Sequence, residues 1–208
     1  MKITAMKFYG GALEKISRLG MAQLFLELQQ VLLNASIEID PVKFGNGAAE
    51  VRAAIDAQFK LGTDWVNTAS GGVDWVKRAR YNQTILVRLG VEIQVSSRSD
   101  LLIRDVVHLR NSLQKSVIDV GIIVVPSDHF QQFLPDRTPC LRDAIRYIEE
   151  EFKEAMTYPI AVIAIEYDRV GAALPKRRTN VGRLVVPVEP VAEDVTGEPQ
   201  ELATDDLE

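Results

Sequence analysis

The chain has 208 residues, of which 47% are hydrophobic and 25% charged, as in an ordinary soluble globular protein with one substantial core. Its single cysteine excludes an intramolecular disulfide framework, and one cysteine with two histidines argues against a structural zinc site. No apolar run approaches the roughly 18 residues of a membrane span, and the first residues lack the apolar core of a signal peptide. We therefore expect a cytoplasmic protein that does not enter a membrane.

The net charge of −5 is divided unevenly along the chain. Eight of the 29 acidic residues lie in residues 188–208, which contain no Lys or Arg. The 24 basic residues therefore face 21 acidic residues in residues 1–187, a net charge of +3 there. We expect residues 1–187 to form a single domain and residues 188–208 to be an acidic, disordered tail. A mildly basic domain is compatible with a polyanionic partner.

Two helices are predicted before Gly62. Apolar residues from Leu13 to Leu33 recur at helical spacing, and residues 48–61 form a second helical pattern that Gly62 closes. Residues 34–47 contain turn formers and are expected to connect the two helices, with room for a short strand.

Residues 70–95 predict two or three strands joined by turns. Asn82 fits a turn, and Gly90 fits a bulge or a break before the strongest strand. In that last strand, apolar residues alternate with Glu92 and Gln94. The two polar side chains are therefore expected on the same face.

The rest of the chain alternates between helices and strands. Helical patterns cover residues 100–115, a short segment at 127–134, and Leu141 to Phe152. Apolar runs rich in β-branched residues at 119–126 and 158–168 predict strands that are buried on both faces. This order predicts an α/β domain with a central mixed β-sheet flanked by helices.

Asp74, Glu92 and Gln94 are the candidate residues for chemistry. A hairpin between their strands would bring Asp74 beside Glu92, and two converging carboxylates repel each other unless a hard cation such as Mg²⁺ lies between them. Such an ion can activate water and stabilise charge on a phosphoryl group. The alternative is that Glu92 and Gln94 simply face solvent and that Asp74 is a turn residue.

The pattern D-x₁₇-E-x-Q, within "VDWVKR" and "GVEIQVSSRSD", resembles the P-D-(D/E)-x-K nuclease superfamily. More narrowly, it is similar to the Bgl II / BstY I type of restriction endonuclease, in which glutamine occupies the usual lysine position. The resemblance spans most of residues 10–168 and implies a restriction-endonuclease-like core. In the relatives the aspartate stands nearer to the glutamate, and here "ARYNQTILV" forms an inserted or lengthened hairpin.

By this resemblance, the site would cleave phosphodiester bonds with Mg²⁺, for which Mn²⁺ can substitute. Asp74 and Glu92 would bind the metal ion, and Glu92 and Gln94 would orient the attacking water. Glu50, at the start of the helix 48–61, is the candidate for a supporting catalytic residue. Alternatively, Glu50 only interacts favourably with the dipole of that helix.

Residues beyond Gln94 would contact DNA according to the same resemblance. Arginine can make a bidentate contact to guanine, and serine can donate to or accept from a base. The candidates are Ser96, Ser97 and Arg98 after the strand, Asp136, Arg137 and Thr138 in the loop 134–139, and Lys77 beside the site. The alternative roles are structural: a strand end that caps the next helix, an ordinary turn and a solvated lysine. His108 and His129 are assigned no chemical role.

The implied function is that of a type II restriction endonuclease. It would act as a homodimer on a short palindrome in double-stranded DNA and leave 5′-phosphates. Two other interpretations stay open at this point. One is a repair or structure-specific nuclease of the same superfamily. The other is a cleavage-inactive DNA-binding protein, which the missing lysine and the unusual spacing of Asp74 would favour.

Overall fold

The computed structural model describes residues 1–18, 20–62, 64–68 and 72–176, and the structural statements below concern these residues. The predicted boundary at residue 187 and the acidic tail lie outside them. The helices are α1 (Ala12–Ile16), α2 (Met21–Asn34), α3 (Ala48–Leu61), α4 (Asp100–Gln114), α5 (Asp128–Gln131) and α6 (Leu141–Arg146). The strands are β1 (Lys2–Phe8), β2 (Glu38–Ile39), β3 (Val66–Asn67), β4 (Trp75–Tyr81), β5 (Thr84–Ile93), β6 (Val120–Pro126), β7 (Ile160–Glu166) and β8 (Arg169–Val170).

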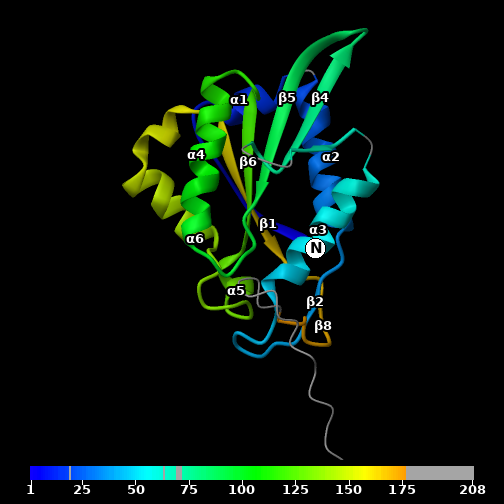
Figure 1. Ribbon diagram of the computed structural model, residues 1–208, viewed down its shortest axis with the longest axis vertical. Helices are drawn as coiled ribbons and strands as arrows, with labels where there is room; N and C mark the ends of the chain where they lie inside the picture. The colour runs from blue at the N-terminus through cyan, green and yellow to red at the C-terminus, as the bar shows by residue number, and fades with distance from the viewer. Residues whose placement is uncertain (19, 63, 69–71, 177–208) are drawn as a thin grey trace, which may run out of the picture. The chain divides into compact units, whose positions relative to one another are not determined.

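Six of these strands form one mixed sheet in the order β1-β7-β6-β5-β4-β3 (Figure 1). The three central strands β5, β6 and β7 are parallel, while β1, β4 and β3 pair antiparallel with their neighbours. The small strands β2 and β8 form a separate parallel pair. The prediction of an α/β domain with a central mixed sheet flanked by helices is confirmed.

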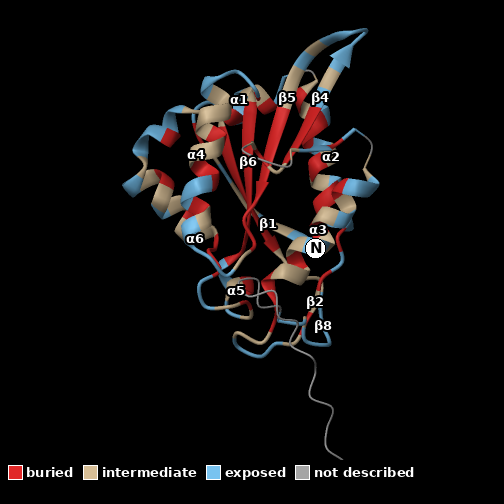
Figure 2. Cartoon of the chain, in the orientation of Figure 1, coloured by how far each residue is buried: buried red, intermediate tan, exposed pale blue. Residues whose placement is uncertain are grey.

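Helices cover both faces of the sheet, so β6, nearly all of β7 and the second half of β5 are buried (Figure 2). Ile122 of β6 packs in the cluster that contains the apolar faces of α1, α2 and α3. Its neighbour Ile123 packs in the opposite cluster with α4 and α6. This alternation explains the continuous apolar run of β6, because each face meets a helical layer. The sheet is therefore a rigid platform for the residues at its ends.

The helical pattern from Leu13 to Leu33 is interrupted in the structure. Gly20 has a φ of 85° and separates α1 from α2, which begins at Met21. Only glycine adopts this conformation without steric cost. Strand β1, which no sequence pattern predicted, is a half-exposed edge strand that pairs with β7. The later pattern from Leu141 also changes, since α6 continues as a π-helix (Tyr147–Glu151) and a 3₁₀-helix (Lys153–Thr157).

The β4–β5 hairpin confirms one predicted turn and corrects one predicted break. Asn82 has a φ of 55° in the turn, as expected. However, β5 runs without interruption through Gly90, and the register shift lies between Ala79 and Arg80 instead. Glycine is required at position 90 for packing, because a Cβ atom there would lie 2.8 Å from Ile118 Cδ1.

Candidate active site

Asp74 and Glu92 meet where β4 begins and β5 ends. Trp75 pairs with Val91 in the antiparallel ladder, which places the preceding Asp74 across from Glu92. The Asp74 backbone N–H donates to Glu92 Oε2 at 3.3 Å, and the Ile93 N–H donates to Asp74 Oδ2 at 2.8 Å. The long hairpin between the two residues therefore lets carboxylates 18 positions apart converge.

Helix α3 supplies a cation to this pair of carboxylates. The Arg52 Nη2 atom lies 3.0 Å from Asp74 Oδ2, and Nη1 donates to the Ile93 carbonyl at 2.6 Å. One turn later, Asp56 accepts from Arg52 Nε at 2.9 Å and from Trp75 Nε1 at 2.9 Å. Burial lowers the pKa of Arg52, but Asp74 and Asp56 outweigh it and hold that pKa above its ordinary value. Arg52 is thus a permanent positive charge on the Asp74 carboxylate.

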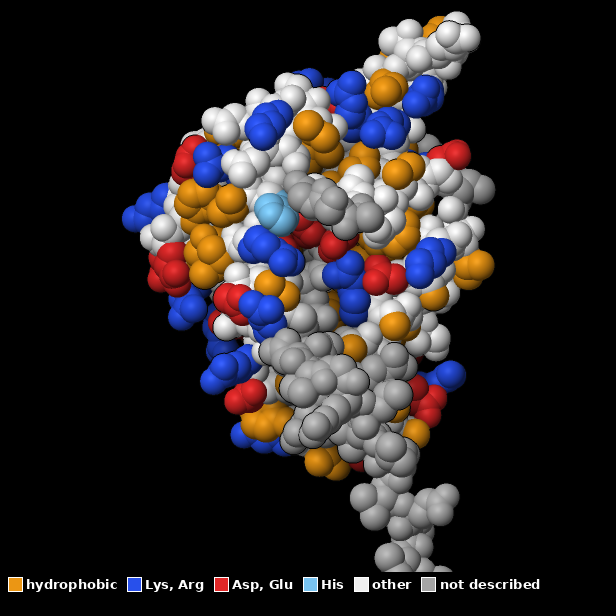
Figure 3. Space-filling view, in the orientation of Figure 1, with side chains coloured by type: hydrophobic (Ala, Val, Ile, Leu, Met, Phe, Trp, Pro, Cys, Tyr) orange, Lys and Arg blue, Asp and Glu red, His pale blue; other side chains and the backbone are white. Residues whose placement is uncertain are grey.

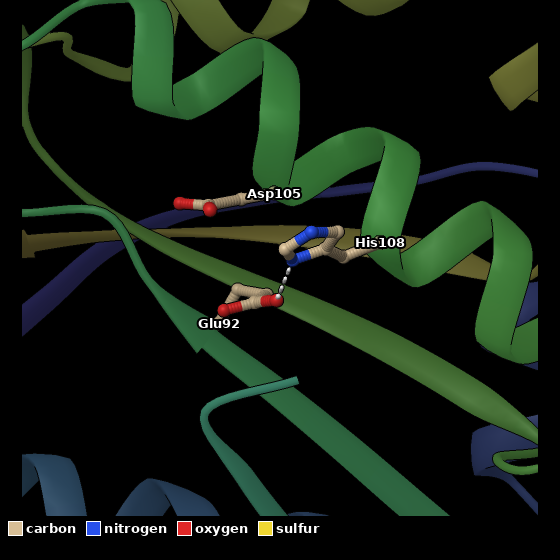
Figure 4. Close-up of side chains that lie close together, drawn as sticks. All are labelled: Glu92, Asp105 and His108. Carbon is tan, nitrogen blue, oxygen red and sulfur yellow. Dashed lines mark ion pairs between the residues drawn. The ribbon is translucent and has the colours of Figure 1, made fainter. Parts of the chain in front are cut away.

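Helix α4 supplies Asp105 and His108 on the other side of Glu92 (Figure 4). His108 Nδ1 lies 3.5 Å from Glu92 Oε1. One ligand atom from each of Glu92, Asp105 and His108 lies within 4.8 Å of the others. Acidic side chains and a histidine also gather near the middle of the face in Figure 3, between Lys and Arg side chains. The α4 residues therefore extend the site beyond the predicted pair.

The carboxylates of this site are crowded. Burial raises the pKa of Glu92 to about 10, and the negative charges of Asp74 and Asp105 contribute to the shift. Burial also raises the pKa of Asp105 to about 7, although Arg104 opposes the change. Burial and Arg104 lower the pKa of His108. Glu92 Oε1 is buried and receives no hydrogen bond from the described residues. This set of oxygen donors fits a hard divalent cation, which would relieve the repulsion and complete the contacts of Glu92.

Gln94 lies on the same side of the strand as Glu92 but turns its amide towards the next segment. It is 2% exposed, and its Nε2 donates to Ser96 Oγ at 3.1 Å and to the Arg98 carbonyl at 3.2 Å. Its backbone N–H donates to the Val124 carbonyl at 2.8 Å and so continues the pairing with β6. Gln94 thus connects the carboxylate site to residues 96–98.

A model of the restriction endonuclease BglII/BglIII family matches residues 5–165, well over half of the chain. The chain belongs to this family of restriction endonucleases. Its fold is also similar to a solved structure described as restriction endonuclease BglII complexed with a DNA 16-mer, with a TM-score of 0.61 and 16% identity. That match covers 81% of this chain and 79% of the other. The comparison with curated proteins gives no match. Among the described residues, none of the helices has the length and apolar character needed to span a membrane.

In this member of the BglII/BglIII family, Glu50 lies in the first turn of α3 and is half-buried. It stands two residues before Arg52, on the helix that reaches Asp74. The contact from α3 to Asp74 described above is made by Arg52. Glu50 thus lies on the helix that contacts Asp74, and its supporting role stays a prediction.

Two of the predicted DNA-binding segments are near each other in space. Ser97 and Arg98 are exposed, and the Arg98 guanidinium contacts the Asp100 carboxylate at 2.6 and 3.2 Å. Asp136 and Arg137 are also exposed, whereas Thr138 is buried. The loop and the first turns of α4 line a common groove of about 460 Å³, and its lining includes Ser99, Asp100, Asp136, Arg137 and Thr138. Residues that follow Gln94 and the loop 134–139 thus present one surface.

Lys77 lies away from that surface. It is 8% exposed, forms an ion pair with Glu27 of α2, and its Nζ lies 5.7 Å from the centre of the Trp65 ring. The structure therefore gives no support to the prediction that Lys77 binds DNA. The physical reason is that side chains alternate along β4, so Lys77 points to the α2 layer while Arg78 is exposed.

Arg52, Asp56, Asp105 and His108 were not among the residues predicted from the sequence. A signal existed for the α4 pair: Asp105 and His108 are three residues apart in a helix whose buried apolar residues are Leu102, Val106 and Leu109. A buried aspartate beside that apolar stripe is unusual. For Arg52 and Asp56 the i,i+4 spacing indicated only a pair on α3, not its contact with Asp74.

Proposed function

We propose that this restriction endonuclease is a type II enzyme that hydrolyses phosphodiester bonds of double-stranded DNA at a short palindromic site. It depends on Mg²⁺, for which Mn²⁺ can substitute, and it leaves 5′-phosphates. The observation that carries the proposal is the convergence of Asp74 and Glu92 at the adjoining ends of β4 and β5, with the main-chain contacts that join them. Membership of the BglII/BglIII family supports it.

Asp74 and Glu92 would hold the metal ion in this proposal. When bound, Mg²⁺ supplies positive charge for the phosphoryl oxygens and for the attacking water. Arg52 fixes the orientation of Asp74, because its guanidinium contacts both the carboxylate and the carbonyl of Ile93. Glu92, together with Gln94, would orient the attacking water beside the ion.

Gln94 is neutral and cannot provide the charge of the lysine that stands at this position in many nucleases of the superfamily. The fixed cation beside the carboxylates is Arg52, which comes from α3 instead of β5. Gln94 orients water and, through Ser96 and Arg98, holds the segment that follows. Glu50 supports the site from the first turn of α3. Arg52 of α3 thus supplies the positive charge and Gln94 orients the water, where many nucleases of the superfamily have a single lysine.

The DNA-reading residues of the proposal are Ser96, Ser97, Arg98, Asp136, Arg137 and Thr138. The last three line the groove beside α4 together with Ser99 and Asp100, which directly follow Arg98, and this supports the assignment. Arg98 must exchange its Asp100 partner for a base, and arginine makes a bidentate contact to guanine. The similar solved structure is a complex with a DNA 16-mer, which supports DNA as the partner. Arg78 and Arg80, both exposed on β4, are candidates for phosphate contacts.

A palindromic site implies a twofold homodimer in which each subunit cuts one strand. Such an enzyme acts on DNA in the cytoplasm. The apolar residues of α4, including Leu102, Val106 and Leu109, are buried within the subunit. Ile103 is exposed on the same helix, so α4 has an apolar side chain that can contact a partner subunit in addition to its buried face.

The proposal is tested by incubating the purified protein with phage DNA and Mg²⁺, beside Asp74→Ala and Glu92→Ala. Wild type should produce discrete fragments whose ends define one palindrome and carry 5′-phosphates, and both variants should leave the DNA intact. Preferential cutting of flaps or junctions would point to a structure-specific nuclease. Binding with and without Mg²⁺ but no cleavage in either condition would point to a DNA-binding protein.

A further inference from the structure

The two oxygens of Glu92 face different partners. Oε2 accepts the hydrogen bond from the Asp74 N–H at 3.3 Å, whereas Oε1 faces His108 Nδ1 at 3.5 Å. Asp105 lies one helical turn before His108 on α4. Figure 4 shows His108 directed towards Glu92, with the Asp105 carboxylate beside them. Glu92 therefore stands between the Asp74 side of the site and a second cluster on the α4 side.

The α4 side holds two buried carboxylates. Arg104 Nη2 lies 3.3 Å from Asp105 Oδ1, so the unmet contact is that of Glu92 Oε1. Glu92 is 2% exposed and Asp105 is 3% exposed, so both carboxylates are removed from water. Glu92 Oε1 is buried and receives no hydrogen bond from the part of the chain that the structure describes. A buried polar atom without a hydrogen bond costs free energy, and more when it is charged. A cation between the three side chains would remove this cost.

The geometry suits a metal ion of a particular class. Ligand atoms at about 2.1 Å from an ion lie at most about 4.2 Å from one another. The candidate atoms lie within 4.8 Å of one another in the absence of an ion, so small side-chain rotations close the site. Two carboxylate oxygens and one imidazole nitrogen favour a first-row transition-metal ion, because Mg²⁺ prefers oxygen ligands only.

We propose that Glu92, Asp105 and His108 form a second divalent-cation site that takes a first-row transition-metal ion such as Mn²⁺, with Glu92 shared between it and the Asp74 side. Its role in cleavage rests on the proposed function, since two cations flanking one scissile phosphate can stabilise the attacking and leaving oxygens. Binding of the ion itself depends only on the three side chains.

The site is tested with the full chain, prepared without a histidine tag, in the absence of DNA and with MnCl₂ as the probe. Electron paramagnetic resonance measures Mn²⁺ affinity, and its pulsed form detects ¹⁴N of a directly coordinated imidazole. The chain has two histidines, so His129→Ala is the matched control for His108→Ala. This control is stringent because His129 also faces a carboxylate, Glu166, at 3.4 Å.

Wild type and His129→Ala should bind Mn²⁺ and show the ¹⁴N signal. His108→Ala should lose the ¹⁴N signal and bind Mn²⁺ at least about tenfold more weakly, and Asp105→Asn should weaken binding to a similar extent. Asp74→Ala should keep the ¹⁴N signal, since Asp74 is not among the three ligands. A ¹⁴N signal that survives in His108→Ala, disappears in His129→Ala, or is missing from wild type would overturn the proposal.

Circular dichroism checks that each variant is folded, and His108→Gln, which retains a polar side chain of similar size, replaces His108→Ala if the latter does not fold. A separate assay of wild-type cleavage in Mg²⁺ distinguishes the two proposals. Cleavage without a ¹⁴N signal would overturn the second site and leave the proposed function standing. A ¹⁴N signal that depends on His108, without cleavage in any cation, would support the second site and overturn the proposed function.

Discussion

The guanidinium of Arg52 lies 3.0 Å from Asp74 Oδ2 and donates to the main-chain carbonyl of Ile93 at 2.6 Å. It therefore joins helix α3 to both strands that carry the candidate carboxylates. A cation in this position neutralises part of the crowded negative charge and fixes the orientation of Asp74. The geometry of the site depends on α3 as much as on the two strands.

Replacing Arg52 by alanine should reduce the rate of DNA cleavage by roughly 100-fold, because small displacements of catalytic groups have effects of that size. Arg52→Lys should recover only part of the rate, since an ammonium cannot contact Asp74, Asp56 and Ile93 through one planar group. Single-turnover cleavage at saturating Mg²⁺ measures the effect. Lys60→Ala is the control, as Lys60 is an exposed cation on the same helix. Equal losses in the two alanine variants would contradict a positioning role for Arg52.

Glu92→Gln should stabilise the metal-free protein at alkaline pH. Burial, with the charges of Asp74 and Asp105, raises the pKa of Glu92 to about 10 in the folded state, against an ordinary value of about 4.3 when unfolded. The unfolded state therefore releases this proton first, and stability falls as pH rises from about 4.3 towards 10. The glutamine variant lacks this penalty.

Thermal unfolding in EDTA at pH 5 and pH 8 provides the measurement for Glu92→Gln. The Tm of the variant should exceed that of wild type by several degrees at pH 8, and the difference should shrink at pH 5, with about 2–4 °C for each kcal/mol. Glu14→Gln, at an exposed position, is the control and should show no such dependence on pH. If the Tm of Glu92→Gln exceeded that of wild type by more at pH 5 than at pH 8, the pKa of Glu92 would not be raised in the folded state.

Lys77→Met should lower stability and leave DNA affinity unchanged, because Lys77 pairs with Glu27 inside the domain. Burial raises the pKa of Glu27, but hydrogen bonds from Lys77 and Gln23 outweigh it and hold that pKa below its ordinary value. The stabilisation is thus present above about pH 4.3 and is lost as pH falls through the lowered pKa. Loss of the partner should cost about 1–3 kcal/mol near neutral pH and less in acid.

The neighbouring Arg78→Met is the matched control for Lys77→Met, since Arg78 is exposed on the same strand. It should leave the free energy of unfolding unchanged and weaken DNA binding, with a shallower dependence on salt. Urea unfolding and DNA titrations at several salt concentrations measure both properties. If Lys77→Met weakened DNA binding more than Arg78→Met did, the structural assignment of Lys77 would be wrong.

Gln94→Glu should impair sequence discrimination and cleavage together. The side chain keeps its size, but a carboxylate cannot donate to the Arg98 carbonyl, which Gln94 contacts at 3.2 Å. Ser96→Ala removes the hydroxyl that accepts from Gln94 and from the Arg98 N–H but leaves the bond from Gln94 to the Arg98 carbonyl, so it should have a smaller effect. The ratio of the cleavage rate on a cognate duplex to the rate on single-mismatch duplexes measures discrimination. If this ratio were unchanged in Gln94→Glu, Gln94 would have no role in recognition.

Much of the fold follows from local sequence patterns. Helical spacing correctly locates α3 and α4, and the apolar runs correctly locate β6 and β7, because each of these elements buries a regular face. Strand β1 was missed because it is half-exposed at the sheet edge and has little apolar contrast. The break expected at Gly90 was wrong because packing against Ile118, not backbone conformation, requires that glycine.

The candidate site was predictable only in part, for a related reason. Asp74 and Glu92 could be paired from the sequence because a hairpin joins their strands. Arg52, Asp105 and His108 reach the same place from helices. Helical spacing places Asp105 beside the apolar stripe of α4, but it does not show that α4 and α3 meet the ends of β4 and β5. The burial of Lys77 likewise depends on Glu27, which is 50 positions earlier in the chain.

Single-turnover cleavage of a defined duplex by wild type and Glu92→Ala tests whether Asp74 and Glu92 form a metal-dependent site for hydrolysis. DNA binding is followed in Ca²⁺ to show that both proteins still bind the duplex. We expect Glu92→Ala to bind the duplex within a few-fold of wild type and to cleave it about 10²–10⁴-fold more slowly in Mg²⁺. Cleavage by Glu92→Ala at the wild-type rate would contradict it.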